Sequence, residues 1–338
     1  MEACSFKSEM TAKDAIELYK LFDQHGIKVW IDGGWGVDAL LGHQTREHDD
    51  LDVALHHSNV SALCKLLGDC GYRHVPSGGS WGCNFVLGDD QGHRIDVHSF
   101  EIDTSGENTF GVAYRAEHLT GVGMIDGYQV RCVAPDWMVK FHTGYPLDKN
   151  DFLDVKALCE KFEIEMPEEH QVYWHFLAEN IIRSETINDH DAIREIHRLA
   201  FGGAAEAKLV DDLRQSGDAV ISLVAEQDSR IIGHVLFSKL KAPMKALGLA
   251  PVAVHPSFQK QGVALALIRE GLDRAKEDGW MCVFALGDPA YYGRFGFRVE
   301  SAEGYTSPYS GSHFMAVPFG DVPKTGEIVY PKPFKLLD

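Results

Sequence analysis

The chain has 338 residues, and at about 150 residues per domain this length predicts two domains. Hydrophobic residues make up 45% of the sequence, which is enough to build two cores. The chain has 32 Lys+Arg against 50 Asp+Glu, and its net charge of −18 would repel a phosphate backbone, so a nucleic-acid-binding protein is not expected.

Cysteine content and apolar patterning indicate a cytoplasmic protein. The seven cysteines are odd in number and include no C-x-x-C pair, so they predict neither a disulfide framework nor a structural zinc site. No apolar run approaches the roughly 18 residues that cross a bilayer. Glu2, Lys7 and Glu9 stand where an export signal would carry an apolar core. We therefore expect no membrane partner.

The first half of the chain mixes helical and strand patterns. Helices are predicted at about 11–25, 35–42, 58–70 and over a later stretch, 134–162, and strands at about 27–32, 50–55, 83–87 and 93–100.

A domain boundary is predicted near residue 180, which divides the chain into domains 1–179 and 180–338. An acidic, proline-containing segment, 163–169, precedes a helix-like stretch at this place. The first 178 residues contain 14 Lys+Arg and 29 Asp+Glu, a net charge of −15, whereas the rest of the chain carries −3. Such a field keeps a surface solvated, and it also attracts cationic small molecules or metal ions.

The second half has the same mixed character, so both halves are predicted to be α/β (α+β). Strands are predicted at 181–186, 219–226, 231–238, 248–254 and 280–286, and helices from the cap signal at Asn188 and Asp189, over 204–216, over 262–278 and from Pro289. The second and third strands are joined by a tight turn and should form a hairpin. Residues 300–338 are expected to complete the last strands.

The first domain carries a pattern of glycines and carboxylates. Gly33 and Gly34 lie where a strand ends and a helix begins, so their bare backbone amides can approach an anion closely. Asp50 and Asp52 alternate along a strand and must point to the same face, where two like charges need a cation. Mg²⁺ is the natural one, and Asp96 on another strand is a third candidate ligand. The alternative is a solvent-exposed strand face.

These segments resemble the antibiotic nucleotidyltransferases of the lincosamide and aminoglycoside 2″ types. The resemblance covers about residues 10–160 and rests on four motifs: IDGGWGVDALLG (31–42), TREHDDLDV (45–53), IDVHSF (95–100) and FHTGY (141–145). It implies a polymerase-beta-like nucleotidyltransferase fold, ATP or another nucleoside triphosphate as donor, and a drug hydroxyl as acceptor.

The same resemblance implies roles for individual residues. Gly33 and Gly34 would hold the triphosphate, Asp50 and Asp52 would bind Mg²⁺, and Asp96 would be the third carboxylate and the base that accepts the hydroxyl proton.

Three further side chains are candidates for contacts with the substrates. Arg46 and His48 are candidates for contacts with the phosphates, and for Arg46 a surface ion pair with an acidic neighbour is the alternative. His98 is a candidate for a substrate contact or for a local hydrogen bond.

The second domain carries a different anion-binding pattern. A buried-type strand, 249–256, runs into an amphipathic helix that begins near residue 262. Small residues at Gly262 and Ala264 allow a pyrophosphate to lie against the amides of the helix start. The helix is predicted to bury an apolar face and to turn Arg269 and other charged residues outward.

This pattern resembles the GNAT N-acetyltransferases over about residues 181–300. The resemblance rests on the hairpin 220–238, on the strand and loop above, and on GDPAYYGRFGF (287–297). It implies a GNAT acyltransferase fold with a mixed central sheet, acetyl-CoA as co-substrate, and Tyr292 as the acid that protonates the departing thiolate. The cofactor-binding residues that it implies are Val252 and Val254 alongside the pantetheine, and Gln259, Gln261, Gly262, Val263 and Ala264 at the pyrophosphate.

Acetyl transfer to an amine needs the amine neutral, hence a base or a water chain. No glutamate interrupts 249–255, so Glu226 and His255 are the candidates, and either could be purely structural.

The predicted function is therefore bifunctional modification of a small antibiotic-like molecule. The acidic first domain suits a polycationic aminoglycoside, whereas the motifs favour a lincosamide. A nucleotidyltransferase with a non-catalytic acetyl-CoA-binding module is one alternative, and nucleotidylation of a protein partner is another. The oligomeric state is not predicted.

Overall fold

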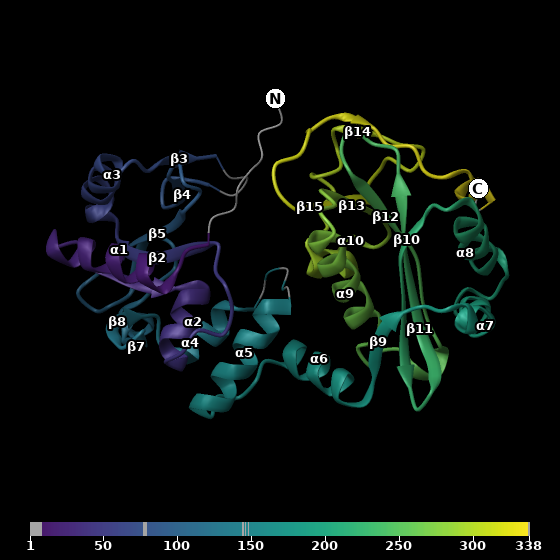
Figure 1. Ribbon diagram of the computed structural model, residues 1–338, viewed down its shortest axis with the longest axis horizontal. Coiled ribbons are helices and arrows are strands. Elements are labelled where there is room, and N and C mark those ends of the chain that lie inside the picture. The colour runs from purple at the N-terminus through teal and green to yellow at the C-terminus, as the bar shows by residue number, and fades with distance from the viewer. Residues whose placement is uncertain (1–8, 77–79, 144, 146, 148, 337–338) are drawn as a thin grey trace. The chain divides into compact units, whose positions relative to one another are not determined.

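The computed structural model describes residues 9–76, 80–143, 145, 147 and 149–336. The chain divides into two compact units, Met1–Thr143 with Leu153–Met166, and Gly144–Phe152 with Pro167–Asp338 (Figure 1). Among the residues described, none of the helices combines the length and the apolarity that a bilayer crossing requires.

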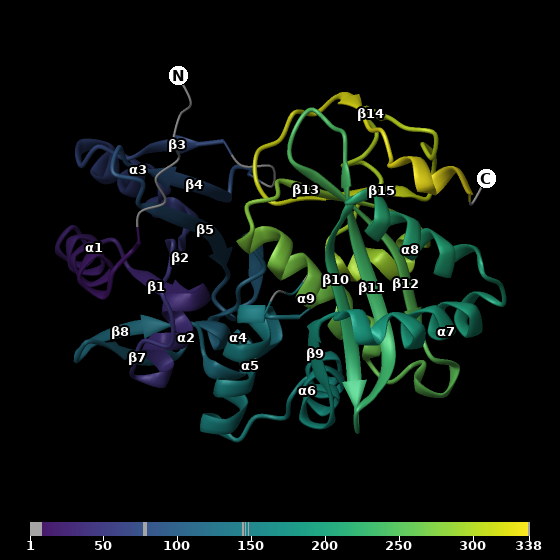
Figure 2. The same ribbon diagram turned by 45° about the vertical axis from the view of Figure 1, so that its right-hand side comes forward.

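The first unit is built on a mixed sheet whose described strands lie in the order β3-β4-β5-β2-β1-β8-β7, with β6 paired to β5 (Figure 2). The strands are β1 (Val29–Asp32), β2 (Asp50–His56), β3 (Arg73–Val75), β4 (Asn84–Gly88), β5 (Arg94–Ile102), β6 (Asn108–Gly111), β7 (Gly121–Ile125) and β8 (Tyr128–Cys132). The helices are α1 (Ala12–Gln24), α2 (Gly33–Leu41), α3 (Val60–Asp69), α4 (Pro135–Phe141) and most of α5 (Lys149–Phe162).

The centre of this sheet carries the acidic strand pattern. β2 pairs antiparallel with β1 and parallel with β5, so Asp52 lies opposite Asp32 on one side and Asp96 on the other. Leu51 and Val53 flank Asp52 along β2 and are fully buried, because successive strand residues face opposite sides of a sheet. One side of β2 therefore fills the core, and the other collects three carboxylates at one level.

Several features of this unit differ from the sequence analysis, and the short strands β3 and β6 are among those not predicted. The predicted helical stretch 134–162 is two helices, α4 and α5. The hairpin β7–β8 was not predicted, although its turn, Asp126-Gly127, has positive φ at both residues (44° and 77°) and Asp-Gly is a strong hairpin signal. β8 also pairs parallel with β1, a long-range contact that local patterns do not reveal.

The second unit is built on a second mixed sheet, in the order β15-β13-β12-β11-β10-β9, with a small separate pair, β14 and β16. The strands are β9 (Ile181–Ser184), β10 (Ala219–Gln227), β11 (Arg230–Leu240), β12 (Ala246–Val254), β13 (Cys282–Leu286), β14 (Tyr305–Thr306), β15 (Phe314–Pro318) and β16 (Gly326–Glu327). The helices are α6 (Glu168–Glu179), α7 (His190–Phe201), α8 (Ala205–Ser216), α9 (Val263–Glu277) and α10 (Pro289–Tyr292).

Helices cover both faces of this sheet. On β10, Leu223 and Ala225 join the core that includes α9, whereas Val224 between them joins the core that includes α7 and α8. Figure 1 shows α9 on one side of the strands and α7 and α8 on the other. The two-residue period of the strand thus separates two apolar layers.

The strands β12 and β13 pair only over the first half of β12. They pair in parallel from Ala246 to Leu249, opposite Cys282 to Ala285. Beyond Leu249, β12 continues to Val254 and pairs with β11 alone among the described strands. One edge of residues 250–254 is therefore open to an extended ligand.

The outward face of α9 differs from the prediction. The sequence analysis places Arg269 in solvent, whereas its side chain is only 3% exposed. Its guanidinium lies over the rings of Phe152 and Phe295 and donates to the Glu169 carboxylate at 2.9 Å. Arg269 is buried because α6 and the start of α5 cover this face of α9.

The core of the second unit therefore begins one helix before residue 180, with α6. Tyr173 and Phe176 of α6 belong to the core of the second unit, against α9. The domain boundary between residues 179 and 180 stays a prediction.

Candidate active sites

The first candidate site lies where β1 ends and α2 begins. Asp32 is the N-cap of α2, and its Oδ1 accepts a hydrogen bond from the Gly33 amide at 2.9 Å. Gly33 has a φ of +54°, and any side chain there would overlap the carboxylate of Asp52. Glycine at this position therefore lets the Asp52 carboxylate lie directly against the start of the helix.

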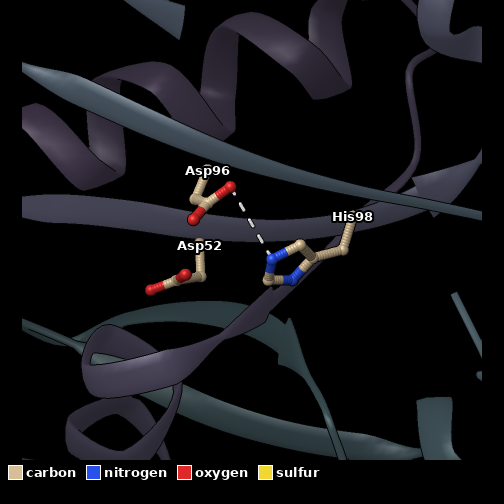
Figure 3. Close-up of side chains that lie close together, drawn as sticks. All are labelled: Asp52, Asp96 and His98. Carbon is tan, nitrogen blue, oxygen red and sulfur yellow. Dashed lines mark ion pairs between the residues drawn. The ribbon is translucent and has the colours of Figure 1, made fainter. Parts of the chain in front are cut away.

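Acidic side chains from three adjacent strands converge here. Asp52, Asp96 and His98 each offer an oxygen or nitrogen atom, and these atoms lie within 4.8 Å of one another (Figure 3). Burial raises the pKa of Asp52 well above its usual value, and the negative charges of Asp50, Asp96 and Asp32 add to the effect. Burial likewise raises the pKa of both Asp50 and Asp96. The positive charge of Arg46 acts in the opposite direction on Asp50 and Asp52, and the upward shift of the pKa prevails.

The donor set fits a divalent cation. Asp96 Oδ1 is buried and has no hydrogen-bond partner among the described residues, and His98 Nε2 lies 3.7 Å away. A buried carboxylate oxygen without a partner is costly, and a cation coordinated by Asp52 and Asp96 would remove that cost. Carboxylate oxygens are the ligands that Mg²⁺ prefers. Asp50 is placed two residues before Asp52 on the same strand face.

Asp32 and Tyr114 were missed by sequence reasoning. Both Asp32 oxygens are used within the protein, since Oδ1 accepts from Gly33 and Oδ2 accepts from the Tyr114 hydroxyl. Tyr114 is buried and also lies 3.4 Å from His98 Nδ1. An Asp between a strand and a Gly-Gly pair is a readable N-cap signal. Nothing in the sequence around Tyr114 links it to this place.

Arg46 and His48 form one hydrogen-bonded chain beside Gly34. His48 Nε2 donates to Asp38 Oδ2 at 2.6 Å, which leaves Nδ1 to accept from Arg46 Nη1 at 3.0 Å. Arg46 Nη2 donates to Asp154 at 3.1 Å. A side chain on Gly34 would collide with the His48 ring and approach Arg46 Nη2 within 2.7 Å. Arg46 therefore forms an ion pair, although with the buried Asp154 and not at the surface as the alternative expected, and the pair holds it at the start of α2.

The motif 141–145 is described only in part, because Gly144 lies outside the described residues. His98, a candidate for a substrate contact or for a local hydrogen bond, belongs to the acidic cluster.

The second candidate site surrounds the start of α9. Gly262 is the N-cap of this helix with a φ of +84°, and Val263 is its first residue, with Ala264 next. Gln259 has extended backbone geometry, and Gln261 Nε2 donates to the Ser257 carbonyl at 3.1 Å. The first amides of α9 have no partner within the helix, as at any helix N-terminus, and can hold an anion. Val252 and Val254 are half-buried on the open part of β12.

Tyr292 ends the short helix α10. Its ring lies over Gly287, directly after β13, and is surrounded by Tyr291, Phe295 and Phe297. Burial raises the pKa of Tyr292 to about 12, so the hydroxyl is protonated at neutral pH. The hydroxyl has no hydrogen-bond partner among the residues that the structure describes.

The two candidate bases line a different cavity. Glu226 accepts from Arg183 at 2.8 Å, and Arg183 also pairs with Asp189. The His255 ring contacts Arg230 at 2.8 Å. Both residues line a cavity of about 580 Å³ beside α7. Glu226 is therefore part of an ion-pair network, and His255 caps the turn after β12 by accepting from the Ser257 amide.

Comparison with known families explains both sites. Residues 14–158 match the family model of aminoglycoside-2″-adenylyltransferases, and residues 190–297 match that of the GNAT acetyltransferases. The chain joins a domain that matches the aminoglycoside-2″-adenylyltransferase family model to a domain that belongs to the GNAT acetyltransferase family. The adenylyltransferase domain holds the acidic cluster, and the GNAT domain holds the loop before α9. The predicted family assignment, fold class and transferase activity are confirmed.

Individual relatives match one domain each. The uncharacterized N-acetyltransferase YhbS of Escherichia coli strain K12 is 42% identical over 125 residues, which are 36% of this chain and 75% of YhbS. The lincosamide resistance protein of Staphylococcus haemolyticus is 26% identical over 161 residues, 45% of this chain and 96% of that protein. The crystal structure of Escherichia coli YhbS in complex with CoA aligns with a TM-score of 0.44 at 36% identity, over 46% of this chain and 92% of that one.

Proposed function

We propose that the adenylyltransferase domain transfers a nucleotidyl group from ATP, or another nucleoside triphosphate, to a hydroxyl of an aminoglycoside or lincosamide, with Mg²⁺. We propose also that the GNAT domain transfers an acetyl group from acetyl-CoA to an amine. The observation that carries the first proposal is the convergence of Asp52 and Asp96 beside Gly33, with a buried Asp96 oxygen that lacks a partner among the described residues.

Each group of the first site has a role in this reaction. Mg²⁺, when bound, supplies neutralisation of the triphosphate charge and activation of the α-phosphorus. Asp50, Asp52 and Asp96 hold the ion, and Gly33 and Gly34 present their amides to the phosphates. Asp96 accepts the proton of the drug hydroxyl while that oxygen attacks the α-phosphorus and pyrophosphate departs. Arg46 adds positive charge near the phosphates.

The GNAT reaction uses the open edge of β12 and the start of α9. Pantetheine pairs as an extended strand alongside Val252 and Val254, and the pyrophosphate lies on the amides of 262–264. The amine attacks the thioester carbonyl, the carbon–sulfur bond breaks, and Tyr292 donates its proton to the departing thiolate. The proton that the amine nitrogen loses passes through solvent water and reprotonates Tyr292. The pKa of about 12 supports this role, since the proton is present at every physiological pH.

Substitution of the acidic cluster tests the first activity. Asp52→Asn or Asp96→Asn should lower nucleotidyl transfer at least about 1,000-fold, because one carboxylate fewer weakens the metal site and, for Asp96, removes the base. The readout is the mass of each drug after incubation with ATP and Mg²⁺, over a panel of aminoglycosides and lincosamides. Asp69→Asn, at an exposed carboxylate on α3, is the matched control. Full activity of either site variant would contradict the proposal.

The charge of the domain and the relatives favour different drugs. A domain that carries −15 attracts a polycationic aminoglycoside, whereas a relative named as a lincosamide resistance protein matches almost over its full length. The panel therefore contains both classes.

A second candidate function is an acetyl-CoA-binding GNAT module without turnover. It is favoured by the pairing of Glu226 with Arg183, which occupies one candidate base. Binding of acetyl-CoA without release of CoA across amines and aminoglycosides would support this alternative, and CoA release with any acceptor would exclude it.

A further inference from the structure

A cavity of about 380 Å³ lies beside the start of α9. Helix α6 forms one wall, the end of β10 and the start of β11 form another, and the loop before α9 closes it with Phe258, Lys260 and Gln261. Its volume is within the range of about 300–1,000 Å³ that holds small ligands. The α6 wall belongs to neither segment matched by the family models.

Helix α6 is packed against the anion-binding loop itself. A side chain on Gly262 would approach Val172 of α6 within 3.0 Å, and Phe176 follows at 3.5 Å. Any molecule held by the first amides of α9 is therefore a close neighbour of this helix.

The chemistry of the cavity fits a nucleoside better than a simple anion. Phe176 and Phe258 offer aromatic surface. Lys260 and Glu179 bring opposite charges, so the cavity has no strong excess of positive charge. Asn180 Nδ2 donates to the Phe176 carbonyl at 2.7 Å, which holds the amide, while its Oδ1 is buried without a hydrogen-bond partner among the described residues. Because a buried acceptor without a partner is costly, a ligand in this cavity should offer a hydrogen-bond donor to Asn180 Oδ1.

We propose that this cavity binds the adenine nucleoside end of acetyl-CoA, with Asn180 Oδ1 accepting from the exocyclic amino group of adenine and α6 serving as part of the cofactor site. This inference rests on acetyl-CoA binding by the GNAT domain. The pyrophosphate on the α9 amides places the attached nucleoside within reach of the cavity, Phe258 packs against the base, and Lys260 faces the ribose phosphate. ATP carries the same base, so the test distinguishes the two sources.

The test is calorimetric titration of the full-length protein with CoA, with pantetheine and with ATP. Asn180→Ala and Phe258→Ala should each weaken CoA binding about tenfold, the loss of one hydrogen bond or one packing contact. Pantetheine, which lacks the nucleotide, should bind these variants and the wild type equally, and so should ATP. Asn188→Ala, at the other cavity, is the matched control.

The following outcomes would contradict the inference. Unchanged CoA affinity in both cavity variants would overturn this inference and leave the proposed function intact. Tighter CoA binding would overturn it by showing that α6 obstructs the site. Weaker ATP binding with unchanged CoA binding would assign the cavity to ATP. Absence of CoA binding by the wild type would overturn the proposed GNAT function and this inference with it.

Discussion

Two glycines of the adenylyltransferase domain determine which side chains can reach the start of α2. Gly33 lies beneath the Asp52 carboxylate, and Gly34 lies beneath His48 and Arg46. A methyl group at either position would displace a charged or hydrogen-bonded group from the helix start. The site therefore depends on the absence of a side chain at Gly33 and Gly34 as well as on the groups that surround them.

The series of hydrogen bonds from Asp38 through His48 to Arg46 predicts that His48 positions the Arg46 side chain. His48→Ala should lower kcat/KM for nucleotidyl transfer about 100-fold, because Arg46 loses the acceptor that orients it at the phosphates. Most of the loss should appear as a higher KM for ATP, measured by steady-state kinetics against both substrates. His48→Asn, which keeps an acceptor, should recover part of the activity. A loss confined to thermal stability, with KM for ATP unchanged, would contradict the prediction.

Tyr292 has a prediction of its own in the GNAT domain. Tyr292→Phe removes the proton donor and should lower kcat of acetyl transfer about 100-fold, with little effect on the KM for acetyl-CoA. Because burial raises the pKa of Tyr292 to about 12, the wild-type rate should show no decline from its deprotonation below about pH 11. Tyr291→Phe, on the neighbouring ring, is the matched control. Equal rates for Tyr292→Phe and the wild type, measured by thiol release, would remove Tyr292 from the mechanism.

At the scale of elements, β9, α8 and β11 are connected by the half-buried carboxylate of Glu185. Glu185 follows β9 and accepts two hydrogen bonds from Arg214 of α8, at 2.8 and 2.6 Å. Its Oε2 also lies 3.5 Å from His234 Nε2 on β11. Burial alone would raise the pKa of Glu185, but hydrogen bonds from His234, Arg214 and Ser222 outweigh burial and hold the pKa well below its usual value.

This network predicts a pH-dependent stability of the GNAT domain. A carboxyl whose folded pKa is depressed stabilises the fold fully above its unfolded pKa of about 4.3, and the contribution is lost as pH falls toward the folded pKa. Glu185→Gln should therefore destabilise the domain by about 1–3 kcal/mol at pH 7 and by less at pH 3. Amide hydrogen exchange in β10 and β11 is the measurement. A pH-independent difference would contradict the linkage.

Helix α9 shows how an element is reassigned by its neighbours. Its apolar face is readable from the sequence, but Arg269 is buried because Phe152 and Glu169 approach from segments 100 or more residues earlier in the chain. The same packing brings α6 to the anion loop. Neither contact can be predicted from the sequence of α9.

At the scale of the whole molecule, the two activities should be separable. Asp52→Asn should abolish nucleotidyl transfer and leave acetyl transfer unchanged, and Tyr292→Phe should do the reverse, because the groups belong to different compact units. Both activities are measured on one preparation by drug mass and by thiol release. Loss of both from either substitution, with folding intact by circular dichroism, would contradict independent sites.

The amino-acid sequence alone determined the features that depend on neighbours a few residues away. The glycine pair after β1, the alternation of Asp50 and Asp52 and the glycine at the start of α9 are local patterns, and strand and helix periodicity translates them directly into geometry. They sufficed to predict two mixed domains, and the longer motifs that contain them carry the resemblance to the two families.

Only the tertiary structure decided which distant groups meet. Tyr114 reaches Asp32 from 82 residues away, and His98 joins the acidic cluster because β5 pairs with β2 in one register. Arg269 is buried and α6 lines a cavity because segments before the GNAT match pack against α9. Such contacts depend on sheet order and on the closure of long loops, and the chain encodes them through the packing of the whole unit and not through any short pattern.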